Sequence, residues 1–189
     1  GDRPLDQLSE SARRYISWGE QQNFNKNYKC RIRKRWYVVP SSWIADAFLI
    51  RQANLYPKMI LNPIGALLTD TLHKVRFLEG VDRNAVACAF LNTYTLALSE
   101  TLGRSYGGGV LTFEPGEMRR MRIPMKGSEK LDIRKIDALQ RMGKYEEILS
   151  YTDSILLTDG LGLSRQDVDL LHSIWNKMRN RRLLRKQSV

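Results

Sequence analysis

The chain has 189 residues with 31 basic and 20 acidic side chains, which gives a formal net charge of +11 at pH 7. This excess of positive charge predicts a negatively charged partner and is typical of domains that bind phosphate backbones. The hydrophobic share of 42% excludes a disordered chain and suffices for one sizeable core. No apolar run approaches the roughly 20 residues that span a bilayer, so the sequence predicts no membrane partner.

The cysteines and histidines show no metal-binding or disulfide pattern. Cys30 and Cys88 lie far apart in the sequence and only two histidines are present, so neither a zinc cluster nor a disulfide framework is indicated. Reduced thiols favour a cytoplasmic location. The first residues, Gly-Asp-Arg-Pro, match neither a signal peptide nor a natural methionine start, which suggests a piece of a longer protein.

The N-terminal segment is expected to form one helix and one strand. Residues 5–19 have apolar side chains at helical spacing, which predicts a short helix. Residues 30–39 alternate with a period of two, which predicts a strand. On that strand Arg31, Arg33 and Arg35 would share one face at about 6.6 to 6.8 Å per two-residue step, a comb that matches successive phosphates.

The middle of the chain is predicted to combine short strands with one core helix. Asp82 can cap a helix whose apolar residues recur every three or four positions until Gly103. Residues 114–117 are expected to turn the chain. Strands are expected where short apolar runs are bounded by proline, glycine or asparagine, at residues 48–53, 58–61, 71–78 and 110–113. These elements predict an α+β fold with a small mixed or antiparallel sheet.

A composition shift at residues 125–130 predicts a boundary between a recognition region, 1–125, and a helical C-terminal extension, 126–189. Helices are expected at residues 133–142, at 145–157 and from Ser164, where Asp167 completes a capping box. The last helix ends in a second basic cluster: Lys177, Arg179, Arg181, Arg182, Arg185 and Lys186. Cations at a helix C-terminus complement its dipole and are usually solvated; the alternative is direct contact with phosphates.

The strongest functional pattern lies at residues 26–36. The segment has six cations and no acidic residue, and Tyr28 and Trp36 are interleaved with the charges. The cations are Lys26, Lys29, Arg31, Arg33, Lys34 and Arg35. Concentrated positive charge repels itself unless a polyanion is near, and flat aromatic rings add stacking contacts. The segment therefore predicts one wall of a nucleic-acid groove; the alternative is a solvated edge strand.

An ordered series of motifs resembles a known family. The motifs are Tyr15-Ile16-Ser17-Trp18-Gly19-Glu20, Tyr28-Lys29-Cys30-Arg31-Ile32-Arg33, Trp36-Tyr37, Pro57-Lys58 with Asn62, Leu91-Asn92-Thr93, Gly107-Gly108-Gly109-Val110-Leu111, Pro115, Glu117 and Ile123-Pro124. In this order and at similar spacing they resemble the C-terminal half of adenine-specific DNA methyltransferases of the gamma class, over about residues 12–125. The segment from Ser164 to Arg185 is similar to restriction–modification methyltransferases of the PstI and BsuBI type.

The resemblance implies a DNA target recognition domain, which fixes the adenine that a separate catalytic half flips out of the duplex. The partners implied are double-stranded DNA and the N-terminal catalytic domain of the same polypeptide. The residues expected to bind DNA are Lys29, Arg31, Arg33, Lys34, Arg35, Trp36, Lys58, Asn62, Arg104, Tyr106 and Gly108.

The motifs of the catalytic half are missing from this sequence. In the family, S-adenosylmethionine binds at a glycine-rich turn that leads from a strand into a helix, and the target adenine binds at an Asn-Pro-Pro-aromatic tetrapeptide. Asn62-Pro63-Ile64-Gly65 lacks the second proline and the aromatic residue, and Gly107-Gly108-Gly109 precedes a strand. We therefore expect no cofactor, metal or catalytic residue in this chain, and S-adenosylmethionine bound by the parent enzyme.

Two other classes remain open from the residues alone. A small DNA-processing enzyme such as a nuclease would also carry this charge, although no Asp/Glu-x-Lys pairing with supporting carboxylates lies beside a predicted strand. An RNA-binding structural module would carry it too. Cleavage of DNA that depends on a divalent metal would favour the first class, and stronger binding of RNA than of duplex DNA would favour the second.

Overall fold

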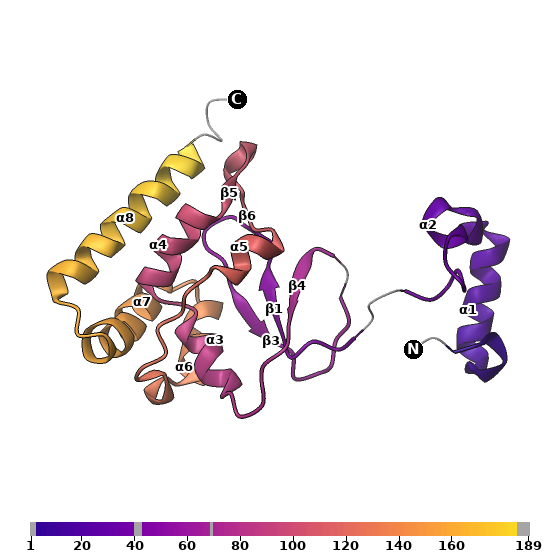
Figure 1. Ribbon diagram of the computed structural model, residues 1–189, viewed down its shortest axis with the longest axis horizontal. Coiled ribbons are helices and arrows are strands. Elements are labelled where there is room, and N and C mark those ends of the chain that lie inside the picture. The colour runs from indigo at the N-terminus through magenta and orange to yellow at the C-terminus, as the bar shows by residue number, and fades with distance from the viewer. Residues whose placement is uncertain (1–2, 40–42, 69, 185–189) are drawn as a thin grey trace. The chain divides into compact units, whose positions relative to one another are not determined.

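The computed structural model describes residues 3–39, 43–68 and 70–184 and divides the chain into two compact units, Gly1–Ile44 and Ala45–Val189 (Figure 1). This division differs from the one that composition suggested. The helices that follow residue 126 belong to the same compact unit as the strands that precede it. A functional boundary near residue 125 stays a prediction.

The N-terminal unit is built on helix α1, Glu10–Gln21. Short helices η1, Leu5–Gln7, η2, Phe24–Lys26, and α2, Tyr28–Arg31, complete it. The predicted helix is confirmed, although it continues past Gly19. Glycine is required there because a Cβ at Gly19 would lie 2.6 Å from Cη2 of the Trp36 ring. The tryptophan therefore packs directly on the helix backbone.

The strand predicted at residues 30–39 is wrong. Residues 28–31 form α2, and turns follow, with Arg33 N–H donating to Cys30 O at 3.2 Å and Val38 N–H to Arg35 O at 3.1 Å. No strand is present among the described residues of this unit, so the alternating segment has no neighbour with which to pair. The comb of Arg31, Arg33 and Arg35 on one strand face is wrong for the same reason.

The C-terminal unit contains two small antiparallel sheets, which confirm the α+β class. The first has the order β3-β1-β4, formed by Met59–Leu61, Ala47–Ile50 and Leu72–Val75. The second has the order β2-β6-β5, formed by Gln52–Ala53, Leu111–Thr112 and Arg104–Ser105. One extended segment serves both sheets: β1 and β2 are separated only by Arg51, whose carbonyl accepts the N–H of Phe113 at 2.9 Å.

Most α-helices of this unit begin at side-chain caps. Asp82 caps α3, Arg83–Ala89, as predicted. The single helix expected from there to Gly103 is wrong, because the first helix ends at Ala89 and Asn92 caps a second, α4, Thr93–Leu102, with its Oδ1 accepting Thr95 N–H at 2.9 Å. The residues expected to turn the chain instead open α5, Pro115–Arg119, with a capping box between Glu114 and Glu117.

The C-terminal helices were largely predictable. They are α6, Ile133–Arg141, α7, Tyr145–Asp153, and α8, Arg165–Leu184. A short helix, η4, Ser128–Lys130, precedes α6, and another, η5, Ser154–Gly160, lies between α7 and α8. The capping box at Ser164 is confirmed: Asp167 Oδ2 accepts from Ser164 N–H at 3.1 Å, and Ser164 Oγ accepts from Asp167 N–H at 3.2 Å.

One hydrophobic core of the C-terminal unit contains residues from both sides of residue 125. Trp175 of α8 is fully buried in a cluster with side chains of α3, α4, α6 and α7. Helix α8 runs beside α4 (Figure 1). A second cluster buries Leu156 and Leu157, with Val168 and Leu171 packed against it. Val168, Leu171 and Trp175 are three or four positions apart, so one face of α8 contributes to both clusters. No helix among residues 3–39, 43–68 and 70–184 is long and apolar enough to cross a membrane.

A buried carboxylate fixes the start of α4. Asp153 accepts hydrogen bonds from Thr93 N–H at 2.8 Å and from Thr93 Oγ1 at 2.5 Å. Burial raises the pKa of Asp153 above its usual value, although the two Thr93 bonds oppose that shift. Asn92 and Thr93 are themselves fully buried. The Leu91-Asn92-Thr93 motif of the family resemblance therefore has a structural role here.

Candidate nucleic-acid interface

The cationic segment of the N-terminal unit is displayed on α2 and the turns after it. Lys29, Arg31 and Lys34 are exposed. Arg33 is half-buried, and its Nη1 donates to Trp36 O at 3.4 Å. Arg35 is also partly buried, and its carbonyl accepts Val38 N–H at 3.1 Å. The six predicted residues of this segment are therefore three exposed cations and three partly buried residues of the turn.

Trp36 anchors the segment. Its ring packs on Gly19, and its Nε1–H donates to Glu20 Oε1 at 3.0 Å. Trp36 is partly buried, and these two contacts tie the turn that carries the cations to α1. DNA contact by Trp36 stays a prediction, and its packing supports a positioning role.

The acidic and basic residues of the N-terminal unit are unevenly distributed along the chain. Residues 1–44 hold nine basic and four acidic side chains, and every acidic one lies at or before Glu20. The stretch 21–44 therefore has six cations and no carboxylate. This composition generates a positive potential that a phosphate backbone would neutralise.

Exposed aromatic rings accompany the cations, and sequence reasoning found Tyr28 among them but missed a cluster on and after α1. Tyr15 and Trp18 stand 5.5 Å apart between ring centroids, and Phe24 meets Trp18 edge-on at 5.4 Å. All three are exposed, as is Tyr28 on α2. The signal was present in the sequence, because Tyr15 and Trp18 are three residues apart and so share a helix face.

In the C-terminal unit, the hairpin of β5 and β6 presents a loop of three glycines, η3, Gly107–Gly109. Tyr106, at the start of the loop, is half exposed. A Cβ at Gly107 or Gly108 would have no atom within 4 Å, so the backbone of both residues faces open space. Gly108 also has a positive φ of 76°, which an L side chain rarely adopts. A backbone this open can approach another molecule closely.

Arg104, at the base of the hairpin, is paired with a carboxylate. Its Nε and Nη2 donate to Glu117 Oε1 at 2.9 and 2.8 Å. The Glu114 backbone N–H and then the Arg104 guanidinium lower the pKa of the Glu117 carboxyl. Arg104 thus fastens the hairpin to α5, and a role of Arg104 in DNA contact stays a prediction.

Lys58 and Asn62 lie on either side of β3. The Lys58 ammonium is half exposed, 5.0 Å from the centroid of the Tyr56 ring. Asn62 holds a turn: its Nδ2 donates to Ala45 O at 2.8 Å and Ala66 O at 3.0 Å, and its Oδ1 accepts Ala66 N–H at 2.8 Å. Both amide hydrogens are engaged inside the protein, so base reading by Asn62 would require these bonds to break.

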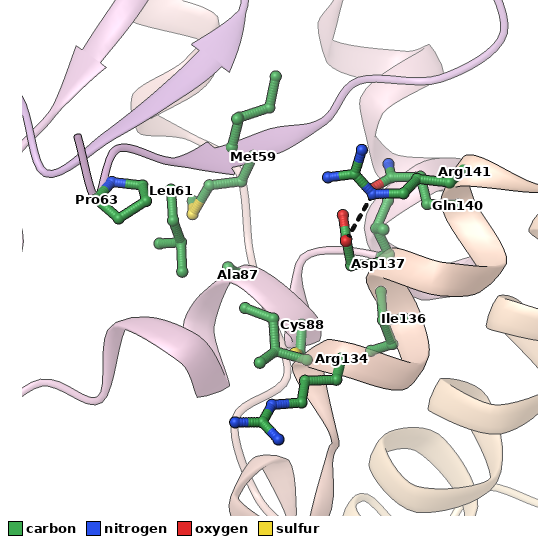
Figure 2. Close-up of a pocket in the computed structure, with 13 residues that line it drawn as sticks. Met59, Leu61, Pro63, Ala87, Cys88, Arg134, Ile136, Asp137, Gln140 and Arg141 are labelled. Atoms are coloured by element: carbon green, nitrogen blue, oxygen red, sulfur yellow. Dashed lines mark hydrogen bonds and ion pairs between the residues drawn. The ribbon is translucent and has the colours of Figure 1, made fainter. Parts of the chain in front are cut away.

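A groove of about 380 Å³ lies between β3, α3 and α6. Figure 2 shows the side chains that line it. Its floor is apolar, with Met59, Leu61 and Ile136, and an ion pair of 2.7 Å between Arg141 Nε and Asp137 Oδ2 lies at its edge. Cys88 is buried at the floor, and burial raises the pKa of its thiol to about 11. At neutral pH this sulfur is protonated and a poor nucleophile.

Neither interpretation of the second basic cluster, solvated cations or contact with phosphates, holds for all of its members. Lys177 and Arg181 are exposed, as the solvated interpretation expects, but Arg179 and Arg182 are buried. The Arg179 guanidinium lies 4.3 Å from the centroid of the Trp175 ring. Arg182 forms an ion pair of 2.7 Å with Glu100 of α4. The remaining two members, Arg185 and Lys186, lie outside the described residues.

Comparisons with known proteins agree with the motif resemblance. The family described as "Type II methyltransferase M.Eco57I, C-terminal domain" matches residues 2–157. Type II methyltransferase M.XamI of Xanthomonas campestris pv. amaranthicola is 26% identical over 128 residues, which cover 64% of this chain and 23% of that protein. No solved structure matches. The chain spans under a quarter of the curated relative. Helix α8 lies beyond the residues that the family matches. Because the family matches most of its length, the chain belongs to the family of C-terminal domains typified by that of the Type II methyltransferase M.Eco57I.

Proposed function

We propose that this chain is the DNA target recognition region of a Type II restriction–modification methyltransferase. The observation that carries the proposal is the acid-free cationic stretch on the N-terminal unit in a chain of this family. Exposed Lys29, Arg31 and Lys34 would neutralise phosphates without reading sequence. The DNA would be the duplex that the rest of the methyltransferase modifies.

The glycine hairpin supports a complementary role in reading bases. Tyr106 and the open backbone at Gly107 and Gly108 can enter a groove, where backbone amides and a phenol can meet base edges. Other candidate readers, such as Lys58, are longer side chains at a strand end. Division of labour between phosphate contacts and base contacts is general among sequence-specific DNA-binding proteins.

Methyl transfer would belong to the rest of the enzyme. Gly107–Gly109 joins two antiparallel strands and does not lead from a strand into a helix, so it does not fit a cofactor-binding turn. The side-chain amide of Asn62 is engaged in hydrogen bonds within the protein, so it is not available to bind a target adenine. We propose that the parent enzyme uses S-adenosylmethionine, that a catalytic domain of the same polypeptide holds it, and that the enzyme works in the cytoplasm.

A salt titration tests the proposal with the chain as it is. We expect the logarithm of its affinity for duplex DNA to fall linearly with the logarithm of salt concentration, with a slope of about −0.9 per phosphate neutralised. Fluorescence anisotropy of a labelled duplex measures this, with unlabelled RNA as competitor. Binding that does not respond to salt would contradict the proposal. More effective competition by RNA than by duplex DNA would instead favour an RNA-binding module.

A further inference from the structure

The buried guanidinium of Arg182 in α8 connects the β5–β6 hairpin, whose loop is Gly107–Gly109, to helices α4 and α8. The Arg182 side chain is 3% exposed, as is that of Glu100. Arg182 Nε donates to Glu100 Oε2 at 3.0 Å and Nη2 to Glu100 Oε1 at 2.7 Å, a two-pronged pair. Its Nη1 donates to Asn54 O at 2.6 Å and to Gly109 O, and Nη2 reaches Leu55 O at 3.5 Å. These bonds engage all five guanidinium hydrogens.

The hairpin loop also touches the helix backbone at this point. Gly109 is buried with a φ of 74°, and a Cβ there would lie 3.3 Å from Leu183 Cα and 3.4 Å from Arg182 O. Gly107 and Gly108, two residues and one residue earlier, face open space. The loop therefore packs against α8 at Gly109 and is exposed at Gly107 and Gly108.

Stability alone does not explain a charge pair in this place. A buried ion pair is often no more stabilising than apolar side chains of similar volume, because both charges lose their hydration. The guanidinium provides directed hydrogen bonds to the carbonyls of Asn54 and Leu55, which follow β2, and of Gly109 in the hairpin loop. An apolar side chain cannot provide these bonds. Lysine would keep the charge but lose the planar fork.

We propose that Arg182 is a positioning residue for sequence recognition: it holds the Gly107–Gly109 loop in the one conformation that reads bases. The inference rests on the proposed function. It assigns to α8, which lies beyond the family match, control over a loop within that match. Phosphate contacts by the N-terminal unit would not depend on it.

The test uses Arg182→Lys, with Arg181→Lys as the matched control because Arg181 is the exposed neighbour on the same helix. Hydrogen exchange is measured on peptides that cover residues 104–112 and, for reference, residues 133–141. We expect Arg182→Lys to accelerate exchange at 104–112 by about tenfold or more and to leave 133–141 unchanged. Arg181→Lys should alter neither region. Unchanged exchange at 104–112 in Arg182→Lys would overturn the proposal.

The second readout is discrimination between a preferred duplex, obtained by selection from random sequences, and a scrambled one. We expect Arg182→Lys to reduce that ratio by about tenfold, roughly the loss of one base contact, while affinity for the scrambled duplex changes by less than about twofold. Equal discrimination in wild type and Arg182→Lys would overturn the positioning role and leave the proposed function standing. A wild-type chain that binds DNA without any preference would instead overturn the proposed function, and this inference with it.

A double variant guards against loss of folding. Arg182→Met with Glu100→Leu removes both charges together, so no uncompensated charge remains buried. We expect this variant to be folded, which a cooperative unfolding transition would show. Its residues 104–112 should exchange faster than in wild type, and its discrimination between the preferred and the scrambled duplex should be reduced. A folded double variant that discriminates as well as wild type would show that the directed hydrogen bonds are dispensable and would overturn the proposal.

Discussion

Replacement of Lys26, Lys29, Arg31 and Lys34 together by glutamine is expected to weaken binding to duplex DNA by about 10²- to 10³-fold near 0.1 M salt and to reduce the log–log salt slope by about 3 to 4 units. These four side chains are exposed and lie in the stretch that has no carboxylate. Each phosphate that they neutralise releases condensed counterions, so their effect on affinity is large and independent of sequence. Anisotropy titrations at several salt concentrations measure both quantities.

The matched control removes the same number of charges elsewhere. Lys126, Lys130, Arg165 and Lys177 are exposed cations of the C-terminal unit. Their replacement by glutamine lowers the net charge equally, and we expect it to reduce the salt slope by less than about one unit. Equal losses in the two quadruple variants would mean that net charge, and not the N-terminal segment, carries the affinity.

Replacement of Trp175 by alanine is expected to lower the free energy of unfolding of the C-terminal unit by about 3–5 kcal/mol, because it leaves a cavity where the largest buried side chain of α8 stood. Trp175 is fully buried, meets the Tyr145 ring edge-on at 6.3 Å between centroids and lies under the Arg179 guanidinium. Urea unfolding followed by circular dichroism measures the loss.

Trp175→Phe is the control for this substitution. The buried Nε1 of Trp175 has no hydrogen-bond partner among the described residues, so phenylalanine gives up no hydrogen bond and keeps most of the apolar contact. We expect a cost below about 1.5 kcal/mol. A loss below about 1 kcal/mol for Trp175→Ala would contradict a shared core and would support an independent C-terminal extension.

Local signals in the sequence predicted most of the helices and strands. Asp82 and Ser164 cap helices because a short side chain reaches the first backbone amides, and that geometry depends only on neighbouring residues. The short strands around Phe48, Ile60 and Lys74 follow from apolar runs between turn residues. Asn92 was misjudged because its apolar surroundings continue the helical period, although its side chain caps the next helix.

Predictions that depended on distant partners failed. The alternation at residues 30–39 looks like a strand, yet a strand requires a neighbour, and the Trp36 ring instead packs on Gly19, 17 positions earlier in the chain. Arg182 looks like a solvated cation at a helix end, yet Glu100, 82 positions away, forms a buried pair with it. Neither partner can be identified from spacing along the sequence.

The sequence indicated where the cations of the candidate site lie, but it did not indicate the roles of several residues around them. The cations of the N-terminal stretch could be found because charge is visible in the sequence. The roles of Asn62, Arg104 and Trp36 could not, because hydrogen bonds within the fold engage their polar groups. Arg182 could be identified in the sequence only as a member of a basic cluster, because its hydrogen-bond partners Glu100, Asn54 and Gly109 are distant in the chain.

Selection of bound duplexes from a random-sequence library by the 189-residue chain, followed by sequencing, is the most direct test of target recognition. If the chain reads DNA, the bound pool should converge on a short motif that binds at least about 10-fold more tightly than its scrambled version, which one base contact worth 1 to 3 kcal/mol provides. A pool that binds with strong salt dependence but contains no enriched motif would contradict target recognition and leave only a non-specific DNA-binding module.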